Sequence, residues 1–184
     1  MSSSHYINNA EFLRCIKEYK NKPKGTIIPN YIGECFMQIA ERLAYKPNFI
    51  NYTYRDEMIC DGIENCVQVI NNFDPNKSSN PFSFFTQIIF FAFLRRIAKE
   101  KKQAYIKLKC IENEGMFDPD FQEYEISSHT KEFLMRARHD IYEYEQKMAA
   151  KKKLDLDKRK KKEPRGLEKF VKGEEWKTLN MNMN

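Results

Sequence analysis

Apolar residues recur at helical spacing in the first part of the chain. One stripe consists of Phe12, Ile16 and Tyr19, and two asparagines that are good helix caps, Asn8 and Asn9, precede it. A second stripe lies within residues 32–43, and a proline at position 47 closes it, because proline cannot continue a helix. These spacings predict two amphipathic helices.

A third helix is predicted over residues 53–73. It opens with the capping-box pattern Thr53-Tyr54-Arg55-Asp56, and its apolar stripe starts at Ile59. It is expected to end at Phe73-Asp74-Pro75, because the residue before a proline avoids the helical region of backbone space.

The most unusual segment is the helix predicted for residues 81–102. Pro81 suits a first helical position, with Ser79 or Asn80 as the cap. Nine large apolar residues crowd this helix: Phe82, Phe84, Phe85, Ile88, Ile89, Phe90, Phe91, Phe93 and Leu94. An ordinary surface helix has a single apolar stripe, whereas these residues point in several directions. More than one side of the helix must therefore be covered.

Two interpretations of this aromatic helix stay open. It is a central helix buried on several sides, or some of its rings form a platform for unstacked nucleic-acid bases. Stacking a base on an aromatic ring contributes ~1–3 kcal/mol, and such platforms need cations nearby for the phosphates. Cations follow directly: Arg95, Arg96, Lys99, Lys101 and Lys102. A basic helix end also complements the helix dipole, so the cations alone do not decide between the two.

The pattern loosens beyond residue 110. An acidic stretch covers residues 112–125, and Ser127 or Ser128 can cap a further helix whose apolar stripe runs from Phe133 to Tyr144. A basic run that cannot bury a core begins at Lys151. We therefore expect an all-α protein in three parts: a compact helical domain over residues 1–110 with its core motif at 55–102, a helical extension over 111–150, and a flexible basic tail over 151–184.

Composition narrows the function classes. The 184 residues are 41% hydrophobic, enough for one modest core, and the net charge of +6 favours acidic partners such as nucleic acid. Neither a Gly-rich phosphate loop nor a nucleophile elbow is present, so we expect no enzymatic activity and no cofactor. The cysteines form no CxxC pair and lie far from the three histidines, so no metal site is expected.

Targeting signals are also not evident in the sequence. The first residues lack the zones of a secretory signal peptide, and the longest apolar run, Ile88 to Leu94, is far shorter than the ~20 residues of a membrane span. Scattered cysteines suit free thiols in a reducing compartment. We therefore expect a soluble, intracellular protein.

The order of residues from 55 to 102 resembles region 2 of sigma-70-type factors. The acidic-apolar helix of that region is similar to Glu57-Met58-Ile59-Cys60-Asp61-Gly62. Its turn is similar to Ile70-Asn71-Asn72-Phe73-Asp74, and its aromatic helix is similar to Phe82-Ser83-Phe84-Phe85-Thr86. The likeness is closer to the late sigma factors of T-even-type bacteriophages, which share the run from Asp61 to Glu64 and a similarly placed Thr86-Gln87. This resemblance implies a sigma factor that directs a bacterial RNA polymerase to late promoters in the cytoplasm of an infected host.

The resemblance implies DNA contacts along the aromatic helix. Three rings would hold non-template bases of the −10 element, with Phe85 stacking on a flipped adenine, and capture of extruded bases would offset the cost of unstacking. The full set expected at the DNA is Phe82, Phe84, Phe85, Gln87, Ile88, Ile89, Phe91, Ala92, Arg95, Arg96 and Lys99. Primary sigma factors carry paired tryptophans where Ile88 and Ile89 stand, so the aromatic wedge at the duplex edge is absent here.

The resemblance also implies protein partners. The acidic helix would face the clamp helices of the polymerase's largest subunit through Met58, Cys60, Asp61, Glu64, Asn65 and Gln68. No second helix-turn-helix module for a −35 element is evident, so such a factor would need a phage co-activator and a tether to the DNA sliding clamp. Residues 166–171 are similar to a clamp-binding motif, with Leu167, Phe170 and Val171 as the contacts. A motif on a flexible linker acts through effective concentration.

Two other hypotheses stay open. One is a co-activator or anti-sigma protein that binds the polymerase through its acidic helix and never touches bases. The other is a generic single-strand-binding protein, which would bind DNA tightly without polymerase.

Overall fold

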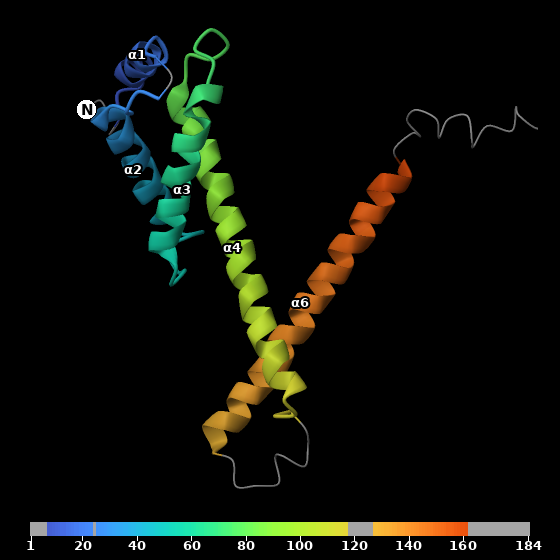
Figure 1. The fold of residues 1–184 in the computed structure, drawn as a ribbon. Helices are drawn as coiled ribbons and strands as arrows, with labels where there is room; N and C mark the ends of the chain where they lie inside the picture. The colour runs from blue at the N-terminus through green and yellow to red at the C-terminus, as the bar shows by residue number, and fades with distance from the viewer. Residues whose placement is uncertain (1–6, 24, 118–126, 162–184) are drawn as a thin grey trace, which may run out of the picture. The chain divides into compact units, whose positions relative to one another are not determined.

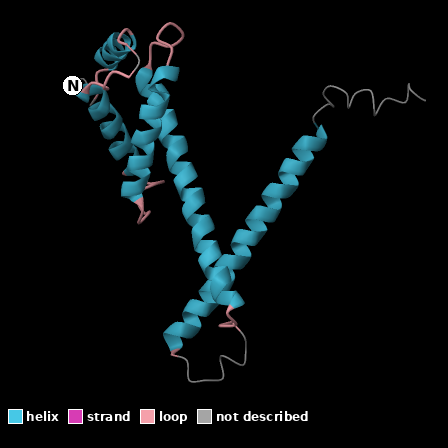
Figure 2. Cartoon of the chain, in the orientation of Figure 1, coloured by secondary structure: helices cyan, strands magenta, loops and turns pink. Residues whose placement is uncertain are grey.

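The computed structural model describes residues 7–23, 25–117 and 127–161, and Figures 1 and 2 show their arrangement. The elements are α1 (Asn9–Lys20), α2 (Asn30–Ala44), α3 (Arg55–Val69), the short 3-10 helix η1 (Ile70–Asn72), α4 (Pro81–Asn113) and α6 (Ser128–Lys161). No strand occurs within these ranges, so the predicted all-α class is confirmed. The chain divides into two compact units, Met1–Ala104 and Tyr105–Asn184, each of which is described here by itself.

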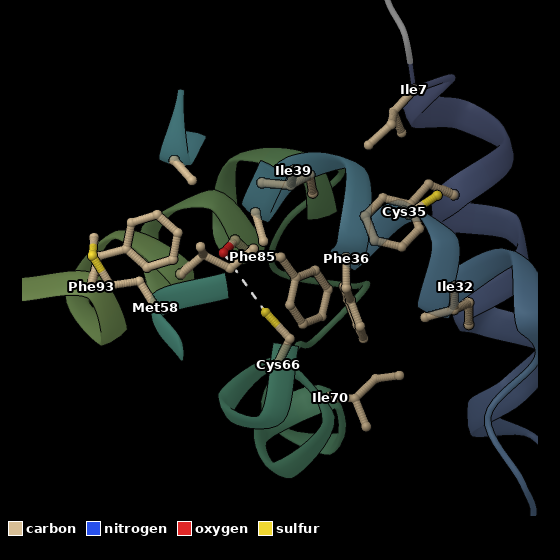
Figure 3. Close-up of a cluster of buried hydrophobic side chains, with 14 of the residues drawn as sticks. Ile7, Ile32, Cys35, Phe36, Ile39, Met58, Cys66, Ile70, Phe85 and Phe93 are labelled. Atoms are coloured by element: carbon tan, nitrogen blue, oxygen red, sulfur yellow. Dashed lines mark hydrogen bonds between the residues drawn. The ribbon is translucent and has the colours of Figure 1, made fainter. Parts of the chain in front are cut away.

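The core of the first unit is built around the ring of Phe85, which is fully buried (Figure 3). Its ring centroid lies 4.6 Å from that of Phe36 on α2, 5.7 Å from that of Phe12 on α1 and 6.0 Å from that of Phe73. The thiol of Cys66 on α3 points at the carbonyl oxygen of Phe85 from 4.0 Å. Three segments thus meet on one aromatic side chain of α4, and α3 contacts the carbonyl oxygen of the same residue.

Polar side chains fix the helix ends of this unit. The side chain of Asn8 accepts hydrogen bonds from the amides of Ala10 and Glu11, and that of Asn80 accepts one from the amide of Ser83, as expected for N-caps. The ammonium of Lys20 donates to the carbonyl oxygens of Asn71 and Phe73, which follow α3. Free carbonyls at a helix end need such donors, so this lysine ties α1 to the end of η1.

The capping box predicted at Thr53 is wrong. The helix begins two residues later, its N-cap residue is Tyr54, and no side chain caps it. Tyr54 instead packs beside Tyr52, with ring centroids 5.2 Å apart, and both rings contact the core. Packing of these two rings outweighs the ~1 kcal/mol that a threonine cap contributes.

In the described part of the second unit, the last nine residues of α4 pack against the first half of α6. Its small core consists of Phe117, Leu134, Ala137 and Ile141, with Tyr105, Leu108, Ile111 and Met116 packed against it. Tyr105 stacks on Tyr144 at 4.5 Å, and Lys109 bridges Glu112 and Glu145 at 2.6 and 3.0 Å.

Helix α6 extends further than predicted. A non-helical tail was expected from residue 151, but α6 continues to Lys161 without interruption. Its sequence contains neither glycine nor proline over this span, and lysine, leucine and arginine are good helix formers. The basic run therefore starts as helix rather than as linker, and residues 162–184 lie outside the described part of the chain.

Helix α4 passes a simple composition test for a membrane span. Its most apolar 18-residue window has a mean hydropathy of 1.2, and 33% of that window is buried inside the protein. The central helix of a water-soluble core passes the same test. Because α4 packs against three other segments through Phe85 and is paired through Arg96 to α3, we interpret it as such a core helix.

Candidate nucleic-acid interface

One side of α4 belongs to the core. Its buried residues in the first unit are Pro81, Phe85, Ile89, Ala92, Phe93 and Ile97, which recur at helical spacing. Three of them, Phe85, Ile89 and Ala92, were expected to contact DNA. At 0%, 0% and 2% exposure they cannot touch a base in this structure, so their assignment to the DNA surface is wrong. Their period fits a core stripe, which is the more common role of such a pattern.

The opposite side of α4 carries exposed aromatic rings. Phe91 is 47% exposed and Phe90 36% exposed, and their ring centroids are 5.8 Å apart. An open groove of about 550 Å³ runs along this side. We call it the aromatic groove; its lining residues are Asn80, Phe82, Ser83, Thr86, Gln87, Phe90 and Phe91. Its wall thus combines aromatic rings, the kind of side chain on which nucleic-acid bases stack, with small polar groups.

A neighbour from outside α4 holds one wall of the groove. The ring of Phe49, which follows α2, packs edge-on against Phe90 at 5.7 Å and against Phe93 at 5.2 Å. Because Phe49 is buried, Phe90 is pinned from beneath while Phe91 stays open to solvent. The groove is therefore attached to the core and not to a loop.

Positive charge continues the same side of α4. An α-helix turns by ~100° per residue. Arg95 therefore lies one turn beyond Phe91 and about 40° from it around the helix, Lys99 lies two turns beyond and about 80° away, and Lys102 lies three turns beyond and about 20° away. All three side chains are exposed. The order of rings and then cations that the sequence predicted is thus present on one side of the helix, with Phe91 in place of Phe85.

The two arginines are held by α3. The guanidinium of Arg96 donates to both carboxylate oxygens of Asp61, at 2.6 and 2.7 Å, and to Glu100 at 3.2 Å. Arg95 donates to the side-chain oxygen of Asn65 at 2.6 Å. The hydrogen bonds that Arg96 donates to Asp61, and then the one that it donates to Glu100, raise the pKa of Arg96 above its ordinary value.

These contacts correct the assignment of Arg96, Asp61 and Asn65. Arg96 was placed at the DNA edge, and Asp61 and Asn65 were placed against the polymerase, but Arg96 binds Asp61 and Asn65 binds Arg95 within the chain. Arg96 and Asp61 have 18% and 29% of their side chains exposed, so neither presents a free charge outward. Arg95 keeps an exposed guanidinium despite its contact with Asn65.

The exposed side of α3 is narrower than predicted. Cys60, Glu64 and Gln68 are exposed, and Gln68 donates to Glu64 at 3.0 Å. Met58 is fully buried in the core and cannot meet a partner, so its assignment to the polymerase surface is wrong. Val67, 44% exposed, was not predicted but adds an apolar residue to this side.

Three further residues that were expected at the DNA are neither fully buried nor fully exposed. Phe82, Phe84 and Ile88 are partly buried and pack against the core of the first unit. Sequence reasoning missed Phe90 and Leu94, which are exposed beside Phe91. About 60° of helical arc separates the exposed Phe90 from the buried Phe93. The clamp-motif residues Leu167, Phe170 and Val171 lie outside the described residues.

Comparisons with known proteins assign no family. No protein-family model matches the chain, and no curated protein matches it in sequence.

Proposed function

We propose that this protein is a sigma-type subunit that binds bacterial core RNA polymerase and directs it to late promoters. The exposed side of α3 meets the clamp helices of the largest subunit, and the aromatic groove of α4 receives unstacked non-template bases of the −10 element. The protein carries no catalytic step, since the polymerase performs the chemistry.

The aromatic groove carries the proposal. It places Phe91 and Phe90 at the surface, beside Gln87 and directly before the exposed cations Arg95 and Lys99. Each ring that stacks on a base contributes ~1–3 kcal/mol, which offsets the few kcal/mol that unstacking a base costs. The cations add a sequence-independent attraction for the phosphates that weakens as salt rises. Base capture is thereby coupled to promoter opening.

The acidic side of α3 supports the polymerase contact. Glu57 and Glu64 are exposed on this side of α3. Cys60, which lies between them in the sequence, and Gln68, which follows Glu64, are exposed as well. Carboxylates would repel DNA, so this side suits a basic protein surface. The resemblance of residues 55–102 to sigma region 2 supports the same partner.

The test begins with co-purification of the chain with bacterial core polymerase. Transcription from a template with an AT-rich −10 element then compares Phe91→Ala with Phe133→Ala, an equally exposed phenylalanine of the second unit (47% and 49%). We expect Phe91→Ala to retain polymerase binding and to lose about tenfold or more of promoter opening, the equivalent of one stacking contact. Phe133→Ala should leave both unchanged.

A co-activator or anti-sigma protein that touches no bases is the second candidate. Burial of Phe85 and internal pairing of Arg96 favour it, because both groups were expected at the DNA. Under this alternative Phe91→Ala has no effect on opening, whereas Glu64→Lys abolishes polymerase binding. Retained binding with lost opening in Phe91→Ala separates the two functions.

We further propose that residues 167–171 tether the protein to the DNA sliding clamp, with a phage co-activator assisting at promoters that offer no −35 contact. A chain that ends before Leu167 should bind polymerase normally and lose the response to added clamp. A full response in the shortened chain contradicts the tether.

A further inference from the structure

The second half of α6 carries the net charge of the whole protein. Residues 147–161 include eight lysine and arginine residues and two aspartates, a net charge of +6, and +6 is also the charge of all 184 residues. The rest of the chain is therefore neutral on balance. The excess of positive charge thus lies on one helix, in the longest run of exposed residues in the described part of the chain, and it needs a separate explanation.

This stretch of helix contacts no core. Every residue from Glu145 to Lys158 is exposed, whereas the first half of α6 buries Leu134, Ala137 and Ile141. Lys151, Lys152 and Lys153 have no hydrogen bond or ion pair with any described residue, in contrast to Lys147, which pairs with Glu143. Their ammonium groups are available to a partner.

The cations surround the helix. At ~100° per residue, Lys151, Lys152 and Lys153 point to three different sides, and Lys158 returns to the side of Lys151 about 10 Å further along. The apolar residues of this stretch form no continuous face: Met148 and Leu156 line one hollow about 80° apart, but Lys152 lies between them, and Leu154 lies about 120° from Met148 on another side. A helix that binds a membrane surface needs a continuous apolar face, which is absent here.

We infer that residues 147–158 of α6 bind the phosphates of duplex DNA in a groove, without regard to sequence. The major groove is about 12 Å wide, admits an α-helix and has a phosphate strand on each wall. Cations on several sides of one helix reach both walls, whereas a flat anionic surface engages one side only. The segment is about 18 Å long, which is about half of one turn of the duplex.

This site is separate from the aromatic groove and does not rest on the proposed function. The groove receives opened bases on the first unit, whereas the basic half of α6 belongs to the second unit and needs an intact duplex. Binding of this kind holds a protein on DNA through counterion release, and its affinity falls steeply with salt.

The experiment measures binding of the full chain to a labelled duplex of about 30 base pairs and scrambled sequence, by fluorescence anisotropy at several salt concentrations and without polymerase. The variant combines Lys151→Gln, Lys152→Gln and Lys153→Gln. Its control combines Lys17→Gln, Lys22→Gln and Lys46→Gln, which removes the same charge from exposed positions of the first unit. Glutamine matches lysine in helix propensity, and circular dichroism checks that helix content is unchanged.

We expect the α6 variant to bind at least about tenfold more weakly than the control at low salt, with a slope of log affinity against log salt that is shallower by about 2–3. The variant with arginine at the same three positions should bind like the unchanged chain. Equal affinity and slope in the glutamine variant and its control overturn the inference. So does a glutamine variant that still binds duplex but no longer binds vesicles of phosphatidylcholine and phosphatidylglycerol, since that result assigns the helix to a membrane.

Discussion

The guanidinium of Arg96 holds the carboxylate of Asp61 through two parallel hydrogen bonds of 2.6 and 2.7 Å that join α4 to α3. This fork-to-fork geometry is the strongest form of an arginine–carboxylate contact. Since both side chains are less than one third exposed, the pair is only partly screened by water. The pair joins α3, which we propose meets the polymerase, to α4, which we propose receives DNA bases, and so sets their spacing and register.

The first prediction concerns the strength of this pair. A double-mutant cycle with Asp61→Ala, Arg96→Ala and the double variant should give a coupling free energy of about 1–2 kcal/mol in urea unfolding, because hydrogen bonds between charged groups contribute more than neutral ones. The matched control is the Arg14–Glu18 pair on α1, which is 3.8 Å long and mostly exposed. Its coupling should stay below about 0.5 kcal/mol. Equal coupling in the two cycles would show that Asp61 and Arg96 do not fix the helices.

The second prediction separates core rings from surface rings on α4. Phe85→Ala should lower the free energy of unfolding by about 3–5 kcal/mol, because it empties a site surrounded by Phe12, Phe36 and Phe73. Phe91→Ala should lower it by less than about 1 kcal/mol, since that ring is 47% exposed. Thermal or urea unfolding of both variants measures the difference. A small loss in Phe85→Ala would restore this ring as a candidate for base contact.

The helical period in the sequence was enough to predict that these segments are helices, although several of their ends lie elsewhere. It gave the starts of α1 and α4 correctly, because Asn8, Asn80 and Pro81 are local signals whose effect does not depend on distant partners. The end of α4 was placed too early, near Lys102. The helix in fact continues to Asn113, two residues before Gly115, whose positive φ of 75° is the left-handed conformation in which helices commonly end.

Which side of α4 faces the core was not predictable from its own residues. Apolar residues occur all around this helix, so Phe85 and Phe91 look alike in sequence. The side of α4 that faces the core is determined by Phe12 and Phe36. These residues come from α1 and α2, and their rings pack against Phe85 and not against Phe91. The pairing of Arg96 with Asp61 likewise joins residues that are 35 positions apart in the sequence. The spacing of neighbouring residues along one helix cannot predict such a contact.

The third prediction concerns the thiols. Burial raises the pKa of Cys66 to about 12 and that of Cys35 to about 11, whereas Cys60 and Cys110 are exposed. A thiol reagent at pH 8 should therefore modify Cys60 and Cys110 quickly, and Cys35 and Cys66 only when the protein unfolds. Mass spectrometry of a time course counts the modified sites. Rapid modification of Cys66 in the folded protein would contradict the packing of α3 on α4.

The same two thiols set a direction for alkaline stability. Their folded pKa values lie above the unfolded value of 9.0, so the folded state keeps protons that the unfolded state loses as pH rises past that point. Their contribution is complete below pH 9 and declines between pH 9 and about 12. Cys66→Ala should flatten this decline, and urea midpoints measured at several alkaline pH values record it.

The last prediction tests how closely α3 approaches α4. A Cβ added at Gly62 would lie 3.0 Å from Ile89 Cγ2 and 3.2 Å from Phe93 Cε1, and both side chains are fully buried and have no room to move. Gly62→Ala should therefore lower the free energy of unfolding by about 1 kcal/mol, because overpacking exceeds the gain in helix propensity. Gly33→Ala on α2 is the matched control, since nothing lies within 4 Å of its added Cβ.

The control should raise the free energy of unfolding by up to about 1 kcal/mol, as the change from glycine to alanine does inside an open helix. The two substitutions should therefore change the free energy of unfolding in opposite directions. The reason is a single difference between the two sites: side chains pack closely against Gly62 and not against Gly33. Stabilisation by Gly62→Ala would mean that α3 and α4 lie further apart. The hydrogen bonds between Asp61 and Arg96, one residue away from this contact on α3, would then have to lengthen as well, so the coupling measured between those two residues provides an independent check on the same helix spacing.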